Sequence, residues 1–368
     1  MWDAHAAQLR ALADADRLRA LAPRAGIDFS SNDYLGLAGS DRLRDAARAA
    51  IDRGIPVGSG GSRLLRGNHP EHEALEAEAA DFFGSETALF LPTGYAANSA
   101  LLATLPQTCD LIVHDERVHA SSHEGMRLTR ATSRSFPHND AAAADAAIAA
   151  WRRTGGTGTP WIAVESLYSM DGDRAPLDDL AAVAARHDAM LVVDEAHATG
   201  VFGTDGRGLA AALGGAHNLI TLHTCGKAMG VEGALVALPR TARDFLVNRA
   251  RGFIFSTAPS PLSAALVRAS LRILADAPEL RTELHGLIAV AGAQLPGAGA
   301  SQIVPVILGE DARAMRVAAG LRERGFDIRG IRPPTVAPGT ARLRISITRN
   351  VDATQIATLG DAIRELTA

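Results

Sequence analysis

Hydrophobic residues form short uninterrupted runs in the middle of the chain, from about residue 86 to residue 256. The runs cover residues 88–91, 111–114, 161–165, 190–194, 219–223, 233–238 and 253–255. Most are separated by alanine-rich stretches with helical spacing, such as 140–153 and 177–187. Short apolar runs of this kind are typical of strands that are buried on both faces. Their alternation with helices predicts a mainly parallel sheet covered by helices on both sides.

The run at 233–238 follows the run at 219–223 too closely for a long helix between them, so one antiparallel strand is expected there. The pattern changes at both ends of the chain. A helix is expected at 3–22, and after Pro259 the pattern predicts a helix at 262–275, a strand at 303–308, a helix at 312–324, a strand at 341–347 and a final helix from Asp352. We therefore expect an N-terminal helix and arm at 1–38, a large domain at 39–275 and a small C-terminal α/β domain at 276–368.

The composition is that of an ordinary soluble protein, with 47% apolar and 21% charged residues in a chain of 368. A net charge of −4 gives no electrostatic case for a nucleic-acid partner. The two cysteines, Cys109 and Cys225, rule out a disulfide scaffold and favour a reducing compartment. The start of the chain lacks a signal-peptide pattern, and no apolar run approaches the ~20 residues that span a bilayer. These features predict a cytoplasmic protein without a membrane partner.

Two ionisable residues follow apolar runs, where an open parallel sheet collects its ligands. Asp194 ends the run 190–194, and burial there favours a cationic partner, such as a protonated pyridine nitrogen. Its alternative role is to cap the segment that follows. Lys227 comes after the run 219–223, among glycines, in a chain whose basic residues are overwhelmingly arginine. Such a lysine suits a Schiff-base nucleophile, with phosphate binding or simple surface exposure as the alternatives.

His119 and His123 have the spacing of a metal pair, but Ala120 stands where zinc proteases have a glutamate. We therefore expect no metal site, and interpret His119 as a ring that stacks on a flat cofactor or as a histidine of the core. The segment 194–197 spells a helicase motif, yet the chain lacks the phosphate loop that those ATPases need. The run 58–62 does not follow a clear strand and is interpreted as a mobile or substrate-facing loop.

Taken in order, the motifs resemble those of the α-oxoamine synthases, pyridoxal-phosphate enzymes with the aspartate-aminotransferase fold. The resemblance extends over nearly the whole chain, with motifs at 30–36, 58–62, 93–98, 119–121, 138–140, 169–173, 194–200, 224–227, 331–335 and 339–344. It implies pyridoxal-phosphate fold type I: a large domain with a mainly parallel seven-stranded sheet, and a smaller C-terminal α/β domain. It also implies pyridoxal 5'-phosphate (PLP) as the cofactor.

The resemblance also implies roles for individual residues. Lys227 binds the cofactor as a Schiff base, Asp194 pairs with the ring nitrogen and His119 stacks on the ring, and these three are the catalytic residues. Further cofactor contacts are assigned to Gly94, Tyr95, Ser169, His197, Thr224, Ser256 and Thr257. The last two match a segment that reaches the cofactor phosphate of the neighbouring subunit, which implies a homodimer with shared active sites. Substrate contacts are assigned to Arg19, Asn32, His119, Thr335 and Arg344, the last pairing with the amino-acid carboxylate.

The implied reaction is the decarboxylative condensation of L-alanine with pimeloyl-CoA or a pimeloyl-carrier thioester, a step of biotin biosynthesis. In it Lys227 also removes the Cα proton. The segment 331–344 favours this reaction over that of a sibling synthase that uses glycine with acetyl-CoA or another acyl-CoA. Residues 348–350 stand where several siblings have a His-Thr pair, and this difference bears on the acyl chain that is accepted. Two more distant alternatives differ in what they require. An ordinary aminotransferase would need no thioester, and a pyridoxal-free ATPase would have no visible absorbance.

Overall fold

The structure is a computed structural model that describes residues 1–368. The chain divides into two compact units. The larger unit contains residues 35–169 and 174–281, and the smaller contains residues 1–34, 170–173 and 282–368. Each unit is described by itself.

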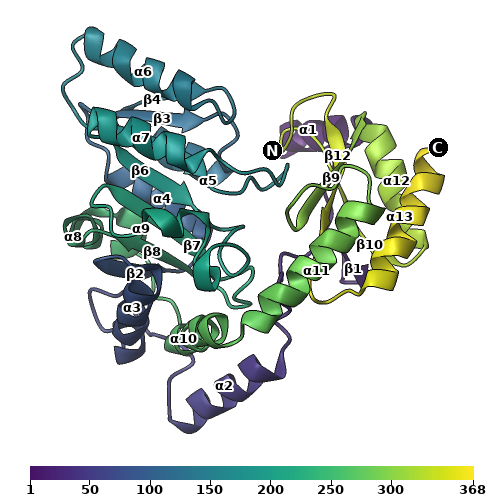
Figure 1. The fold of residues 1–368 in the computed structure, drawn as a ribbon, viewed down its shortest axis with the longest axis horizontal. Helices are drawn as coiled ribbons and strands as arrows, with labels where there is room; N and C mark the ends of the chain where they lie inside the picture. The colour runs from purple at the N-terminus through teal and green to yellow at the C-terminus, as the bar shows by residue number, and fades with distance from the viewer. The chain divides into compact units, whose positions relative to one another are not determined.

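A seven-stranded sheet forms the centre of the larger unit (Figure 1). Its strands are, in spatial order, β2 (Thr87–Leu91), β8 (Ala234–Leu238), β7 (Leu219–Thr224), β6 (Met190–Asp194), β5 (Pro160–Glu165), β3 (Leu111–Asp115) and β4 (Thr132–Phe136). All neighbouring strands are parallel except β8, which is antiparallel to β2 and to β7. The predicted sheet is therefore confirmed, including its single antiparallel strand.

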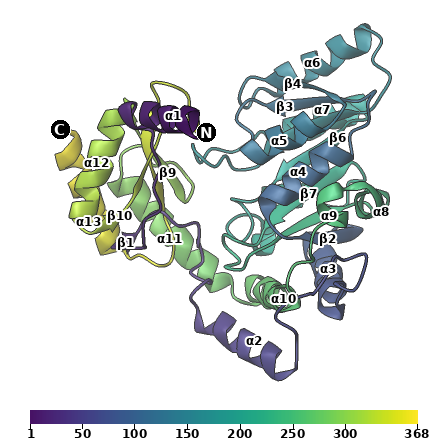
Figure 2. The same ribbon diagram turned by 180° about the vertical axis from the view of Figure 1, so that it is seen from behind.

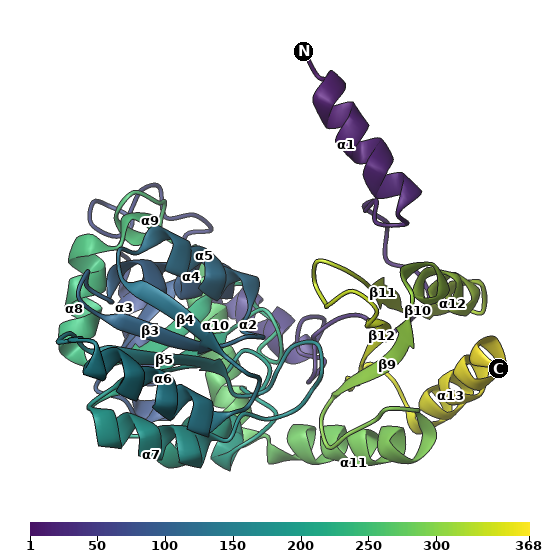
Figure 3. The same cartoon turned by 90° about the horizontal axis from the view of Figure 1, so that it is seen from above.

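Helices cover both faces of this sheet, as Figure 3 shows. The larger unit contains α2 (Asp41–Asp52), α3 (Pro70–Phe83), α4 (Gly94–Thr104), α5 (Ala120–Leu128), α6 (Ala141–Arg153), α7 (Leu177–His187), α8 (Arg240–Arg249), α9 (Arg251–Ile254) and α10 (Pro261–Asp276), with short 3₁₀ turns at Thr204–Gly206 and Leu209–Leu213. Along β3, Ile112 packs in the core cluster of α4 and α5, whereas Val113 packs in that of α6 and α7. Successive side chains of a strand point to opposite faces, so both must be apolar in this central strand.

One strand was not predicted, and two local predictions were wrong. The edge strand β4 was not predicted, because its residues are exposed except for Phe136 and it contains no apolar run. The run 253–255 is not a strand: it lies at the end of α9, where Phe253 is buried. The first helix, α1 (Asp3–Asp14), is shorter than the predicted 3–22. The chain leaves it at Asp16, whose φ of 55° is incompatible with a right-handed helix.

The smaller unit contains a three-stranded antiparallel sheet in the order β11 (Arg329–Ile331), β12 (Ala341–Ser346) and β9 (Ile303–Gly309). A separate parallel pair joins β1 (Ile27–Asp28) to β10 (Phe326–Asp327). Its helices are α1, α12 (Asp311–Glu323), α13 (Ala353–Thr367) and most of α11 (Pro278–Gln294). Helix α12 packs against the sheet and against α13 (Figure 2). No helix of the structure is long and apolar enough to cross a bilayer.

Candidate active site

Polar side chains gather at the carboxyl edge of the seven-stranded sheet, where the parallel strands β5, β6 and β7 end. The register of β5 and β6 places Glu165 beside Asp194, and Thr224 ends β7. Lys227 follows Thr224 in a turn closed by a hydrogen bond from Gly230 N to Lys227 O (2.9 Å). The sheet therefore brings the predicted lysine and the predicted carboxylate to one edge of the larger unit.

Asp194 is 8% exposed, and each of its carboxylate oxygens accepts a hydrogen bond. Oδ2 accepts from Asn98 Nδ2 (2.6 Å), and Oδ1 accepts from Ala196 N (2.8 Å). The second bond caps the turn after β6, which is the alternative role considered for this residue. The two roles are compatible because each carboxylate oxygen can accept more than one hydrogen bond. These bonds hold the carboxylate in one orientation at the strand end.

Asn98 lies on α4 and connects Asp194 to His119. Its Nδ2 also donates to Ser121 Oγ (3.1 Å), which lies 2.7 Å from His119 Nδ1. Asn98 was not among the predicted site residues. A buried amide on the apolar helix α4, 3% exposed, was the available signal, because a buried polar group requires a partner.

His119 caps α5, and its ring makes an edge contact with Tyr95 at 6.1 Å between ring centroids. The residue is exposed as a whole, yet the protein shields the ring enough to lower its pKa. The Lys227 charge lowers the pKa further, while Asp194 opposes this effect. The ring therefore lies within the fields of both key residues, and a lowered pKa favours the neutral form that suits stacking.

Lys227 is the only lysine in the chain. It is half-buried, and its Nζ lies 2.6 Å from His197 Nε2. His197 is itself 4% exposed, in the turn after Asp194. The structure thus brings Lys227, His197, Asp194 and His119 together at one edge of the sheet.

The first turn of α4 contributes unpaired backbone N–H groups to the same edge. Thr93 caps the helix by accepting from Ala96 N (3.0 Å), and Gly94 and Tyr95 are its first residues. A Cβ atom at Gly94 would lie 3.1 Å from Thr224 Oγ1, so glycine permits the close approach of the helix to β7. A helix N-terminus with this shape binds phosphate well. Together with an anionic partner for a ring nitrogen and a lysine amine, these residues fit PLP.

The remaining predicted cofactor contacts lie on two loops of the larger unit. Ser169 is held through its backbone N, which donates to Glu165 Oε2 (3.0 Å). Ser256 and Thr257 are exposed on the segment after α9. Glu165 was not among the predicted site residues, although it ends a buried strand in the same way as Asp194.

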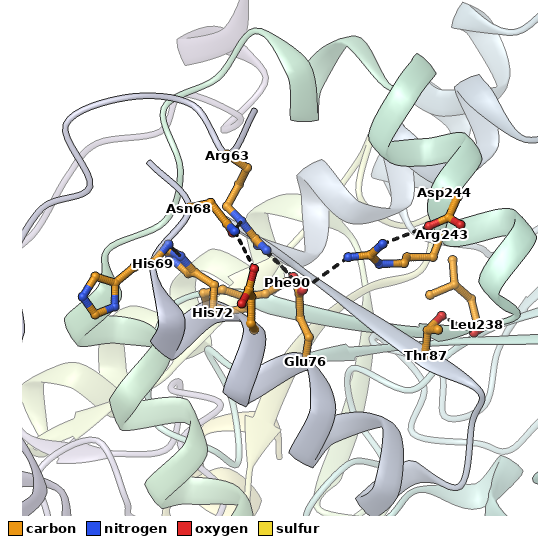
Figure 4. Close-up of polar contacts among 11 residues, drawn as sticks. Arg63, Asn68, His69, His72, Glu76, Thr87, Phe90, Leu238, Arg243 and Asp244 are labelled. Atoms are coloured by element: carbon orange, nitrogen blue, oxygen red, sulfur yellow. Dashed lines mark hydrogen bonds and ion pairs between the residues drawn. The ribbon is translucent and has the colours of Figure 1, made fainter. Parts of the chain in front are cut away.

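The glycine-rich loop 58–62 is hydrogen-bonded to Ala258, the residue after Thr257. Ser59 Oγ donates to Ala258 O (2.6 Å), and Ala258 N donates to Gly61 O (2.8 Å). At the end of the loop a buried ion pair joins Arg63 to Glu76 on α3, at 2.8 Å (Figure 4). The loop is therefore hydrogen-bonded to the residue that directly follows the exposed segment 256–257.

Of the residues predicted to contact substrate, His119 lies in the larger unit and the other four lie in the smaller unit. Arg344 is 7% exposed and donates to Ser346 Oγ (2.8 Å) and to Tyr34 OH (3.5 Å). Tyr34 OH in turn donates to Asn32 Oδ1 (3.0 Å). In a separate contact Arg19 Nη2 donates to Thr335 Oγ1 (3.4 Å). The smaller unit therefore pairs Arg344 with Asn32 through a tyrosine, and Arg19 with Thr335.

The fold and this arrangement of residues define a class of enzyme. Residues 24–363 match the family described as aminotransferase class I and II, and the chain belongs to this family. The match covers both units of the structure.

Comparisons with individual proteins narrow the resemblance. The chain is 44% identical to the 8-amino-7-oxononanoate synthase of Chromobacterium violaceum, over 92% of this chain and 88% of the relative. Among solved structures it is similar to the serine palmitoyltransferase of S. paucimobilis with bound PLP–myriocin aldimine, with a TM-score of 0.88, 27% identity, and coverage of 99% and 97% of the two chains. The 8-amino-7-oxononanoate synthase of Francisella tularensis has a TM-score of 0.76 and 28% identity, over 92% of this chain and 97% of that one. These findings confirm the resemblance that the motifs predicted.

Proposed function

We propose that this chain is a PLP-dependent acyltransferase that condenses L-alanine with a pimeloyl thioester to 8-amino-7-oxononanoate, releasing CO₂ and the thiol. One geometric observation carries the proposal: the only lysine, Lys227, lies at the same sheet edge as the buried carboxylate Asp194. The 44% identity to a synthase of this name supports the choice of substrates.

Bound PLP supplies an electron-accepting ring that stabilises negative charge at the Cα of an attached amino acid. The carboxylate of Asp194, oriented by Asn98 and Ala196, would favour the protonated form of the ring nitrogen. The first N–H groups of α4 would hold the phosphate, and the ring of His119 would stack on the cofactor.

Lys227 has two tasks in this mechanism. Its amine would hold the cofactor, and the same Nζ would take the proton from the alanine Cα. His197, 2.6 Å from Nζ, orients the amine. Arg344 binds the alanine carboxylate through two parallel hydrogen bonds, with Tyr34 and Ser346 holding its guanidinium in place.

The proposed enzyme is a cytoplasmic homodimer in which Ser256 and Thr257 contact the phosphate of the neighbouring subunit's cofactor. Both residues are exposed, and Phe255 beside them is 73% exposed. A groove of about 890 Å³, lined by Tyr95, Phe245 and Ser256 among others, lies at this surface. Exposed aromatic side chains beside a polar segment are typical of a surface that a second subunit covers.

The test is turnover by the PLP-loaded protein with pimeloyl-CoA and alanine, glycine or serine as the amino acid. Free thiol and CO₂ are both measured, because condensation with decarboxylation releases them in equal amounts. We expect turnover with alanine at least tenfold above that with glycine or serine. Turnover with glycine or serine above that with alanine, or thiol release without CO₂, contradicts the proposal.

A further inference from the structure

Two buried carboxyl groups lie side by side at the edge of the sheet. The parallel strands β5 and β6 pair Glu165 with Asp194, and the two residues are 3% and 8% exposed. On the other side of β5, β3 ends at a third carboxylate, Asp115, which is fully buried. Like charges this close together and this far from water repel each other, so a neutral form is favoured for one member of such a group.

The hydrogen bonds distinguish the three groups. Asp194 accepts a bond on each oxygen, and Asp115 accepts from Arg117 N (2.8 Å) and Asn139 N (2.7 Å) and lies 3.0 Å from His138 Nδ1. Glu165 accepts one bond only, from Ser169 N on Oε2. Its Oε1 is buried without a hydrogen-bond partner. An ionised carboxylate in that position would leave a charged oxygen without a hydrogen-bond donor, which costs free energy. A protonated carboxyl group carries no charge and needs fewer donors around it.

The charges that face Glu165 act in the same sense. Burial raises the pKa of this carboxyl group well above its ordinary value of 4.5, Asp194 and Asp115 raise it further, and Lys227 and the Ser169 amide oppose them. The proton therefore belongs on Glu165, the group with the fewest hydrogen-bond donors around it.

We propose that Glu165 is a positioning residue that carries a proton, fixes Ser169 through its backbone amide, and leaves Asp194 as the charged carboxylate of the pair. This role rests on the proposed function, because Asp194 and Ser169 are the residues that would meet the cofactor. A second negative charge beside Asp194 would change the charge that the ring nitrogen experiences. A neutral Glu165 satisfies Ser169 N without adding that charge.

Glutamine is a close mimic of a protonated glutamate: it is neutral and keeps an oxygen that can accept from Ser169 N. We expect E165Q to keep the wild-type visible absorbance and a PLP dissociation constant within about threefold of wild type. E165A loses the acceptor for Ser169 N, and a lost hydrogen bond of this kind corresponds to a dissociation constant raised by about tenfold. A dissociation constant for E165Q raised tenfold or more overturns the proposal, as does an unchanged constant for E165A.

The second measurement uses the protein without cofactor. In the folded state the raised pKa keeps the proton on Glu165, while the unfolded chain releases it above about pH 4.5. The stability of the wild type therefore falls as the pH rises from about 4.5 toward the raised pKa of the folded state. E165Q has no such proton, and its urea midpoint should rise relative to wild type between pH 5 and pH 8. If the urea midpoints of E165Q and wild type differ by the same amount at every pH, Glu165 is ionised in the folded protein. This result refutes the proposal.

These two measurements separate the proposal from the proposed function. Wild-type protein that binds no PLP defeats the function, but the urea comparison still tests the proton on Glu165. If E165A does not fold, the PLP dissociation constant and the urea midpoints of E165Q decide alone.

Discussion

Replacing Glu76 by alanine removes the acceptor at the centre of a buried network on α3 (Figure 4). Glu76 is 6% exposed, and its Oε1 accepts from Arg63 Nη1 (2.8 Å) and from Phe90 N (3.0 Å), while Oε2 accepts from Arg63 Nη2 (3.1 Å). The variant leaves the guanidinium of Arg63, 9% exposed, with Asn68 Oδ1 at 2.6 Å as its remaining side-chain acceptor. Removing one partner of a buried ion pair costs about 3–5 kcal/mol. We expect the free energy of unfolding of E76A to fall by about this amount.

The assay is urea unfolding followed by circular dichroism, with the slope of the transition compared between variants. Glu78 on the same helix supplies a matched control, because it pairs with Arg268 and Arg272 where all three side chains are partly exposed. Each ion pair of this kind contributes about 0–1 kcal/mol, so E78A, which loses two, should lower the free energy of unfolding by no more than about 2 kcal/mol. A loss below about 1 kcal/mol for E76A, or equal losses for both variants, refutes the reasoning.

Three further variants test other parts of the structure. Asn98→Ala removes the donor to Asp194 Oδ2 and should lower the free energy of unfolding, measured in urea, by about 1.5–3 kcal/mol. The control Ser99→Ala should lower it by less than about 1 kcal/mol, and equal losses would contradict the role of Asn98. Burial lowers the pKa of His223 from 6.5 to about 3, so stability is complete above pH 6.5 and is lost as the pH falls toward 3. Between pH 6 and pH 4 the free energy of unfolding should therefore fall less steeply with pH for His223→Gln than for wild type. The difference in slope should reach up to about 1.4 kcal/mol per pH unit, and identical slopes would exclude a neutral His223. Arg344→Lys should raise the KM for alanine by about tenfold or more with unchanged PLP affinity, since lysine cannot reproduce the two-pronged bond; an unchanged KM would remove Arg344 from the substrate site.

The central strands could be predicted from the sequence because burial on both faces leaves an uninterrupted apolar run. Strand β3 is buried along its whole length, and its run was recognised. The edge strand β4 has one covered face at most, so Thr132–Phe136 contains no such run and was missed. Residues 253–255 show the opposite error, because three apolar residues fit one turn of a helix as well as a strand.

The candidate site could be predicted where position along a strand determines position in space. Asp194 and Lys227 were found because each follows an apolar run at the same edge of the sheet. Asn98 lies inside a helix, and its contact with Asp194 depends on how α4 packs on the sheet. Glu165 did end a predicted strand, but its bond to Ser169 depends on the conformation of the loop that follows. Its place beside Asp194 depends on strand register, which a single sequence does not specify.

The attachment of PLP to Lys227 is the central claim, and reduction with borohydride tests it most directly. The PLP-loaded protein is reduced, digested and analysed by mass spectrometry, with Lys227→Ala treated in the same way. Because the chain has no other lysine, we predict one pyridoxyl group per chain on the peptide that contains Lys227, and none on the variant. A protein without a reducible absorbance band, or with label only at its N-terminal amine, would contradict the account.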